Sequence, residues 1–276
     1  MSKQTYEAFT YQCEGHIAEV RLNRPDRHNA LPVSFWEDFP RVLRKIDDDT
    51  RIRVLILSAE GRNFSAGMDL AFFDRISARE NEDPGRYREW IRREILRLQQ
   101  AISLLEEVRV PVIAVVQGAC IGGGLDLACA TDLRICTAEA YFSIHEINIG
   151  MTADLGTLQR LPKLMPPTLV NKLAYTGCRL NAFEAKAVGF VCDVHVDLDA
   201  AMRQAHELAG QICEKSPLAI AGTKVALRHA RDHSVPDSLQ QIAAWNAAMF
   251  ISEDLKLGME AQRNKAPARY RNILGE

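Results

Sequence analysis

Three carboxyl groups follow a run of glycines and are the side chains best suited to move protons to and from a substrate. Asp126 comes directly after Gly118-Ala-Cys-Ile-Gly-Gly-Gly-Leu125, and Glu146 and Asp154 lie further along the chain. Carboxyl groups that crowd together push one pKa upward, so one can act as an acid while another acts as a base. The spacing alone does not show that the three meet. Each also has a simpler explanation. Asp126 can complement the dipole at a helix start, Glu146 can end a strand in solvent, and Asp154 can be an ordinary turn residue.

The glycines of Gly122-Gly-Gly124 stand between an apolar segment and a predicted helix. Amides at a helix start lack internal acceptors, so they can hold an anion or an oxyanion, and glycine lets a ligand approach them. A tight packing turn explains the same residues equally well. The run matches neither common nucleotide-phosphate motif. A second turn, Phe64-Ser-Ala-Gly-Met-Asp-Leu70, also follows an apolar segment, and together the two turns would offer two amides to one carbonyl oxygen.

Other catalytic systems find little support in the sequence. It contains no Gly-x-Ser-x-Gly nucleophile elbow. Ser143 and His145 lie two residues apart on a predicted strand, an arrangement that is more often surface than catalytic. The seven cysteines form no Cys-x-x-Cys pair, which predicts neither a disulfide framework nor a zinc site.

The composition is that of an ordinary globular chain of 276 residues, with 47% hydrophobic and 25% charged residues. The formal net charge of −2 gives no overall attraction to nucleic acid or to an anionic membrane. No apolar run reaches the roughly 18 residues that a membrane span requires, and no secretory leader or C-terminal targeting signal is evident. We therefore expect a cytoplasmic protein with neither a nucleic acid nor a membrane as partner.

Strands alternate with helices in the part of the chain that contains these residues. Apolar or alternating segments predict strands at residues 17–22, 53–59, 111–116, 133–136 and 141–144. The polar residues 75–86 predict a loop. The strands must position the acids and the two turns at their ends.

Helices are predicted both between these strands and beyond them. A capping box at Ser34 predicts a helix start, with a kink or an early stop at Pro40. Apolar residues at helical spacing from Tyr87 to Leu105 predict a long helix, and residues 125–131 a short one. From about residue 197 onward the pattern is all-helical, so we expect an α/β core followed by a helical extension.

The motifs of the chain, and the order in which they follow one another, resemble those of the crotonase superfamily, also called the enoyl-CoA hydratase/isomerase family. The matching segments begin with Val20-Arg-Leu-Asn-Arg-Pro25, Asn29-Ala-Leu31 and Phe64–Leu70, and continue with Gly118–Leu127, Thr131-Asp-Leu-Arg134, Gly156-Thr-Leu-Gln-Arg-Leu161 and Glu184-Ala-Lys-Ala-Val-Gly189. The resemblance implies a spiral core of ββα units over residues 1–195 and a C-terminal helical region for trimerisation over residues 196–276. It also implies an acyl-CoA substrate, a homotrimer or a dimer of trimers, and no metal or redox cofactor, since coenzyme A is part of the substrate.

The resemblance also implies roles for particular residues. The backbone amides of Met68 and Gly123 match the oxyanion hole of the family, which binds the thioester carbonyl. Contacts to the substrate's adenine and pantetheine map onto Ala66, Gly67, Asp69, Leu70 and Arg24.

Within the family, the acids most resemble those of the dienoyl-CoA isomerases. This implies a shift of 3,5-dienoyl-CoA to 2,4-dienoyl-CoA, with Glu146 acting near C2, Asp154 near C6, and Asp126 as a third catalytic acid that tunes and orients them. Hydratases usually have Glu at the position of Asp126. Enoyl-CoA hydration and a single-acid Δ3-Δ2 isomerase remain alternatives, as does a relative that binds RNA or acts as a scaffold.

Overall fold

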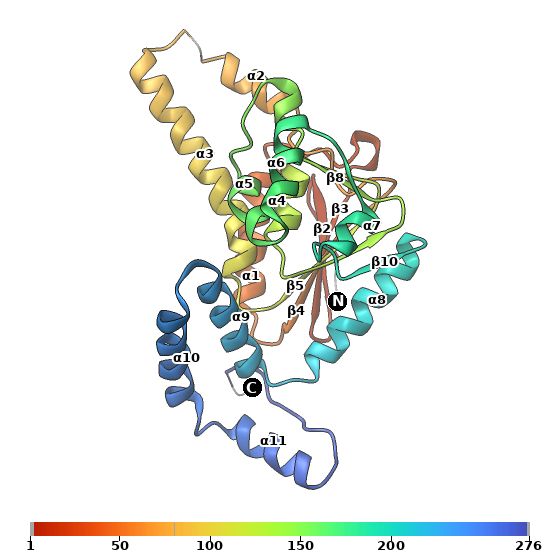
Figure 1. The fold of residues 1–276 in the computed structure, drawn as a ribbon, viewed down its shortest axis with the longest axis vertical. Coiled ribbons are helices and arrows are strands. Elements are labelled where there is room, and N and C mark those ends of the chain that lie inside the picture. The colour runs from red at the N-terminus through yellow and green to blue at the C-terminus, as the bar shows by residue number, and fades with distance from the viewer. Residues whose placement is uncertain (1–2, 80, 275–276) are drawn as a thin grey trace.

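The computed structural model describes residues 3–79 and 81–274 and has the predicted α/β core followed by helices (Figure 1). Its strands are β1 Gln4–Thr5, β2 Phe9–Glu14, β3 Ile17–Leu22, β4 Val54–Ala59, β5 Val112–Val116, β6 Ala119–Ile121, β7 Leu133–Thr137, β8 Tyr141–Ser143, β9 Leu180–Asn181 and β10 Asp193–His195. Its α-helices are α1 Phe35–Asp48, α2 Ala71–Ser77, α3 Pro84–Glu107, α4 Gly123–Cys129, α5 Thr157–Arg160, α6 Pro167–Thr176, α7 Ala182–Ala187, α8 Leu198–Cys213, α9 Pro217–Asp232, α10 Val235–Met249 and α11 Glu253–Arg263. Short 3-10 helices are η1 Pro25–Arg27, η2 Glu146–Ile149 and η3 Leu161–Lys163.

The main sheet has seven strands in the order β1-β2-β3-β4-β5-β7-β10. The pairs among β1, β2 and β3 are antiparallel, and the pairs from β3 through β10 are parallel. Strands β4 and β5 are buried along their whole length, as expected for parallel strands covered on both faces. Their carboxyl ends therefore open at one edge of the sheet, where the two glycine-containing turns follow them. A smaller sheet, β6-β8-β9, extends from that edge.

Helices cover the two faces of the sheet with separate apolar clusters. Alternate residues of β4 and β5 face opposite ways, so that Leu55 and Ala114 join the large core with α1 and α3, whereas Ile56 and Val115 face α8. Helix α8 presents a row of small, fully buried residues to the sheet, namely Ala201, Ala205 and Ala209. The predicted boundary at residue 195 falls between β10 and α8, and stays a prediction.

The long helix α3 confirms the prediction from its apolar stripe, but the predicted loop over residues 75–86 is wrong at both ends. Helix α2 extends to Ser77 and α3 begins at Pro84, with Asp83 accepting a hydrogen bond from the Arg86 amide as N-cap. The polar composition did not reveal these helices because their exposed turns have few apolar residues to bury. Residue 80 lies outside the described residues.

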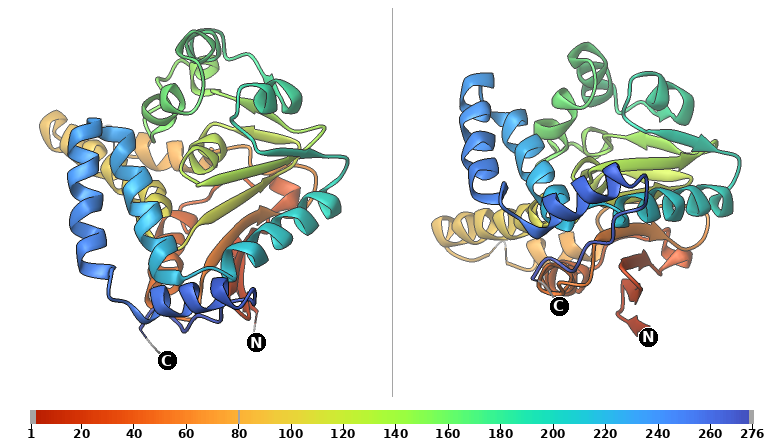
Figure 2. Two further views of the ribbon diagram at one scale, coloured as in Figure 1. Left: turned by 60° about the horizontal axis from the view of Figure 1, so that its bottom comes forward. Right: turned by 90° about the horizontal axis from the view of Figure 1, so that it is seen from below.

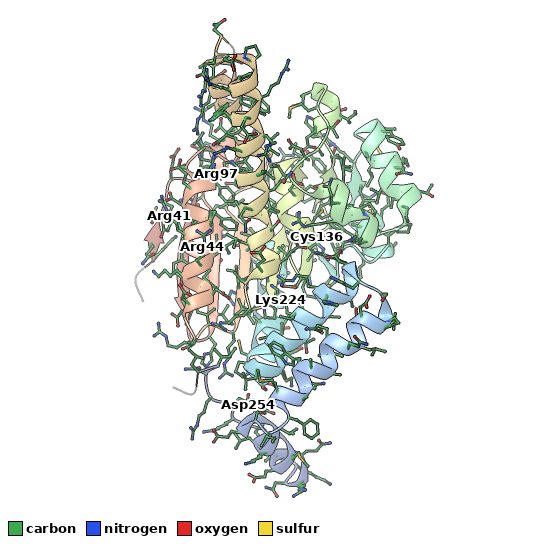
Figure 3. All side chains as sticks on the ribbon, turned by 90° about the vertical axis from the view of Figure 1, so that its left-hand side faces the viewer. Arg41, Arg44, Arg97, Cys136, Lys224 and Asp254 are labelled. Atoms are coloured by element: carbon green, nitrogen blue, oxygen red, sulfur yellow. The ribbon has the colours of Figure 1, made fainter. Side chains whose placement is uncertain are left out.

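Helix α1 begins where predicted, but the predicted capping box is wrong, and of the kink or early stop predicted at Pro40 the stop does not occur. Ser34 has helical backbone angles, and its side chain makes no capping hydrogen bond. The helix continues past Pro40, which has no amide hydrogen to donate to the Trp36 carbonyl. The guanidinium of Arg97 on α3 donates to that carbonyl instead, at 3.3 Å. Figure 3 shows α1 and α3 side by side, with Arg97 labelled. A tertiary contact thus satisfies the carbonyl that proline leaves free.

The C-terminal helices pack beside the core, with α10 lying along α9 and α11 turning under the sheet (Figure 2). Lys224 of α9 fixes this arrangement. Its ammonium group is buried and donates to the carbonyls of Leu105 and Val110 at 3.0 and 2.9 Å and to the Asp132 carboxylate at 2.8 Å. Figure 3 places Lys224 between α9 and the end of α3. No helix among the described residues is both long and apolar enough to cross a membrane.

We predict that Lys224→Met destabilises the protein by about 3 kcal/mol, since loss of one partner of a buried ion pair leaves the other groups uncompensated. Methionine keeps the unbranched shape of the side chain, one atom shorter, but removes all three hydrogen bonds. The measurement is the free energy of unfolding in urea, with Lys256→Met on the exposed side of α11 as the matched control. Equal stability of the two variants would show that the Lys224 contacts contribute nothing net.

Candidate active site

The two glycine-containing turns meet at the carboxyl edge of the sheet. Ser65 and Cys120 form an isolated parallel bridge, in which the Ser65 amide donates to the Ala119 carbonyl at 3.0 Å and the Ile121 amide to the Ser65 carbonyl at 3.1 Å. On the other side, the Leu31 amide donates to the Gly67 carbonyl at 2.8 Å. Backbone hydrogen bonds therefore fix the first turn from both sides.

The contact between the turns requires glycine at position 67. Gly67 has a φ of +90°, and a Cβ built on it would lie 3.0 Å from the Ile121 carbonyl oxygen and 3.1 Å from the Gly123 nitrogen. A Cβ on Gly123 would lie 3.6 Å from the Met68 nitrogen, so the amides of Met68 and Gly123 are near neighbours. Within residues 3–79 and 81–274, neither amide donates to a protein acceptor. Two adjacent free amides can bind one oxyanion, as the sequence predicts.

Asp126 lies in the first turn of α4, directly after the glycines, and is fully buried. One carboxylate oxygen accepts hydrogen bonds from the amide and the hydroxyl of Thr157, both at 2.7 Å. The other oxygen is buried and has no partner in the described residues. Burial raises the pKa of Asp126 to about 7, the Thr157 hydrogen bonds oppose the rise, and the Glu146 charge adds to it. Asp126 is placed to hold Thr157 and not to reach solvent.

Glu146 and Asp154 lie at the surface of the same site and are both partly exposed. The sequence suggested that Glu146 ends a strand, but β8 stops at Ser143 and Glu146 begins η2. A carboxylate oxygen of Glu146 lies 3.3 Å from the position of a Cβ on Gly122, beside the oxyanion turn. Burial raises the pKa of Glu146, with a further rise from the Asp154 charge, and burial also raises the pKa of Asp154. The two carboxyl groups are therefore electrostatic neighbours.

The predicted substrate contacts lie on the rim of this site. Arg24 donates to the Asp69 carboxylate at 2.9 Å and to the Ala30 carbonyl at 2.8 Å, and the arginine holds the pKa of Asp69 below its usual range. Leu70 is 74% exposed. Ala66 is half-buried next to Gly67. Arg24 and Asp69 thus neutralise each other, and their contacts to a substrate stay predictions.

Three residues at the site were not singled out from the sequence. Thr157 binds Asp126, Gln99 of α3 donates to the Asp154 carbonyl at 2.6 Å, and Arg160 donates to the Leu155 carbonyl at 3.4 Å. Polar residues on the otherwise amphipathic helix α3 were the available signal for Gln99. Because such residues usually face solvent, their partners became evident only from the fold.

Comparison with known proteins gives the same family as the motifs. The family described as enoyl-CoA hydratase/isomerase matches residues 12–272. The chain is 39% identical to a peroxisomal Delta(3,5)-Delta(2,4)-dienoyl-CoA isomerase of Arabidopsis thaliana, over 99% of each chain. It is 40% identical to the mitochondrial enzyme of that name from Homo sapiens, over 89% of this chain and 76% of the human one.

Solved structures show the same fold. A crystal structure of an enoyl-CoA hydratase/isomerase from Marinobacter aquaeolei has a TM-score of 0.88 to this chain at 24% identity, covering 96% of this chain and 99% of that one. Its likeness confirms the predicted crotonase-like α/β fold.

The names of the relatives overturn the predicted location. One is peroxisomal and the other mitochondrial, so the cytoplasmic location predicted above is wrong. That prediction depended on the lack of an apolar leader and of a C-terminal targeting signal. The first of these tests for secretion only, because mitochondrial leaders are amphipathic. Because the family match covers nearly the whole chain and both motif turns are in place, the chain belongs to the enoyl-CoA hydratase/isomerase family, the crotonase superfamily.

Proposed function

We propose that this protein converts 3,5-dienoyl-CoA to 2,4-dienoyl-CoA, the activity for which the two relatives are named. The substrate is a coenzyme A thioester with double bonds at C3–C4 and C5–C6. The product has its double bonds at C2–C3 and C4–C5, in conjugation with the thioester carbonyl. One proton leaves C2 and one arrives at C6, so the reaction is balanced without an oxidant, a reductant or water.

In the first step, the Glu146 carboxylate takes a proton from C2. The electron pair of the broken C–H bond moves into the conjugated system and places negative charge on the thioester oxygen. The free amides of Met68 and Gly123 stabilise that charge, an effect for which loss of one donor typically costs about 2.7–4 kcal/mol. Glu146 suits this step because it lies beside the oxyanion turn.

In the second step, Asp154 in its acid form delivers a proton to C6, and the double bonds settle at the 2 and 4 positions. The burial that raises the pKa of Asp154 keeps a larger share of it protonated near neutral pH. Glu146 ends the cycle protonated and Asp154 ionised, so a proton exchange with solvent or between the neighbouring acids restores the starting state.

The observation that supports this proposal most is the different burial of the three acids. Hydration needs two carboxyl groups that hold one water at the double bond, and Asp126 is fully buried with one oxygen bound to Thr157. The two acids that remain accessible are Glu146, which begins η2, and Asp154, which lies in the irregular segment after η2. Two accessible acids at separate points suit proton removal at one carbon and delivery at another.

We further propose that the chain acts as a homotrimer, or a dimer of trimers, assembled through its C-terminal helices. Helix α10 supports this, because it is rich in apolar residues and none of them is buried within one chain. Val235, Leu239, Phe250 and Ile251 along α10 and just after it are each more than 60% exposed. The chemistry itself is proton transfer by carboxyl groups and backbone amides, and calls for no metal or redox cofactor.

We predict that Asp154→Asn lowers formation of 2,4-dienoyl-CoA by at least ~10²-fold, the low end of general acid–base contributions. Asparagine keeps the shape but cannot deliver a proton to C6. Exchange of the C2 hydrogen with deuterated solvent should continue, because Glu146 and the oxyanion amides are intact. The measurements are the ultraviolet absorbance of the conjugated product and deuterium content at C2 and C6.

Asp199→Asn on the exposed side of α8 is the matched control for this variant. If Asp154→Asn keeps the isomerase rate of the control, or if it loses isomerisation and C2 exchange equally, the separate role of Asp154 is refuted.

The same variant yields a prediction about pH. In the share of molecules whose Asp154 is ionised, its charge helps to raise the pKa of Glu146, so the neutral asparagine lowers that pKa toward its ordinary value. Glu146 must be ionised to take the C2 proton, so the acidic limb of the C2-exchange profile should move to lower pH in Asp154→Asn. An unmoved limb would show that the two acids do not interact.

A third prediction tests the oxyanion site with two neighbouring glycines. A Cβ on Gly123 meets only ordinary contacts, the nearest at 3.4 Å from Leu31, but it lies beside the Met68 amide where the oxyanion binds. Gly123→Ala should therefore fold normally, judged by its melting temperature, and lose at least ~10²-fold in kcat, the cost of one oxyanion donor.

Gly124→Ala gives the contrasting case. Its Cβ would lie 2.8 Å from the Ser65 Cβ, so this variant should lower the melting temperature. A fully active Gly123→Ala protein contradicts the assignment of the oxyanion site.

A further inference from the structure

A polar stripe on α3 lies against the segment that contains Asp154. Gln99, Ser103 and Glu106 stand at positions i, i+4 and i+7 and therefore share one face of the helix. Their neighbours Leu98, Ile102 and Leu105 form the apolar stripe that packs in the core. The helix thus has a second, polar face that is directed at another part of the protein.

Each member of this stripe contacts residues 154–160. The Gln99 side-chain amide donates to the Asp154 carbonyl at 2.6 Å. The Arg160 guanidinium donates to the Ser103 hydroxyl at 3.0 Å and to the Glu106 carboxylate at 2.7 and 3.0 Å. Arg160 also reaches back to the Leu155 carbonyl at 3.4 Å. Two successive carbonyls, those of Asp154 and Leu155, are therefore held by side chains from the stripe or attached to it.

The segment is held from a second direction by α4. Thr157 donates its amide and its hydroxyl to Asp126, both at 2.7 Å. Residues 151–154, which precede it, contain neither helix nor strand, so the backbone supplies no regular hydrogen-bond ladder there. Of these hydrogen bonds, the one from Gln99 is made to the backbone of Asp154 itself. The direction of the Asp154 side chain depends on the orientation of that peptide group.

We propose that Gln99 is a positioning residue for Asp154, which aims its carboxyl group at the far end of the substrate by holding its carbonyl. This inference rests on the proposed function, in which Asp154 delivers the proton to C6. Gln99 itself touches no reacting atom. Its loss should affect the step at C6 and leave the step at C2, which depends on Glu146 and the oxyanion amides.

The test compares Gln99→Met with Gln100→Met. Methionine matches the length of glutamine and suits a helix, but has no hydrogen to donate. Gln100 is the next residue of α3 and is exposed, which makes it a matched control. Because a misplacement of about 1 Å can cost ~10²-fold, Gln99→Met should lower kcat for isomerisation by roughly 10–100-fold. KM and C2 exchange should stay within about twofold of the control, as expected when substrate binding and the first step are untouched.

Hydrogen–deuterium exchange of the backbone amides of residues 151–157 gives a readout that needs no catalysis. Exchange in this segment should be faster in Gln99→Met and unchanged in Gln100→Met, because loss of the Gln99 hydrogen bond lowers the free energy of local opening. Unchanged exchange, or an unchanged kcat in protein that isomerises the substrate, overturns the inference. A wild-type protein that forms no 2,4-dienoyl-CoA overturns the proposed function instead, and amide exchange then still decides whether Gln99 holds the segment.

Discussion

The structure depends above all on the close contact between two backbone turns, at Gly67 and Gly123. The first turn follows β4, and the second follows β6, the short strand that comes directly after β5. Strands β4 and β5 are neighbours in the main sheet and run in the same direction, so their carboxyl ends open side by side. Two peptide groups can then approach closely only because a side chain is absent where they meet. In the described part of the chain the amides of Met68 and Gly123 have no protein acceptor, although backbone hydrogen bonds hold the turns around them. The strands thus fix the positions of the two turns, and the absence of side chains at the glycines lets the turns come close together.

A second constraint is the burial of charge next to that opening. Asp126, Glu146 and Asp154 differ in exposure, and in the proposed mechanism this difference gives them different tasks. Asp126 is fully buried, and one of its carboxylate oxygens accepts a hydrogen bond from the Thr157 amide, so it is poorly placed to exchange protons with a substrate. Glu146 and Asp154 remain partly exposed, and burial raises the pKa of both. A site with one supporting acid and two working acids is suited to moving a proton between two distant carbons.

Much of this could be predicted from the sequence, because the decisive residues stand in short local motifs. The strand over residues 17–22, the long helix α3 and the all-helical region after residue 197 follow from apolar periodicity, which reports directly on burial. The roles of Met68 and Gly123 came from a family resemblance; the two amides are neighbours without an acceptor in the described residues, and their binding of an oxyanion stays a prediction. By contrast, the passage of α1 through Pro40 depends on Arg97 of another helix, and no local pattern reveals such a tertiary contact.

The same reason explains why Gln99 was not singled out from the sequence. The apolar stripe of α3 is visible in the sequence, but a polar stripe looks like a solvated face until the partner segment is known. In the structure, the two stripes lie on one helix, so the packing that fixes α3 in the core also fixes the polar residues that meet the Asp154 segment. Glu106 extends this connection, because Arg231 of α9 pairs with the carboxylate that also binds Arg160. The segment of Asp154 is therefore connected both to the core, through α3, and to the C-terminal helices, through Arg231, whereas the oxyanion turn at Gly67 is held by backbone hydrogen bonds to Leu31 and to the segment after β5.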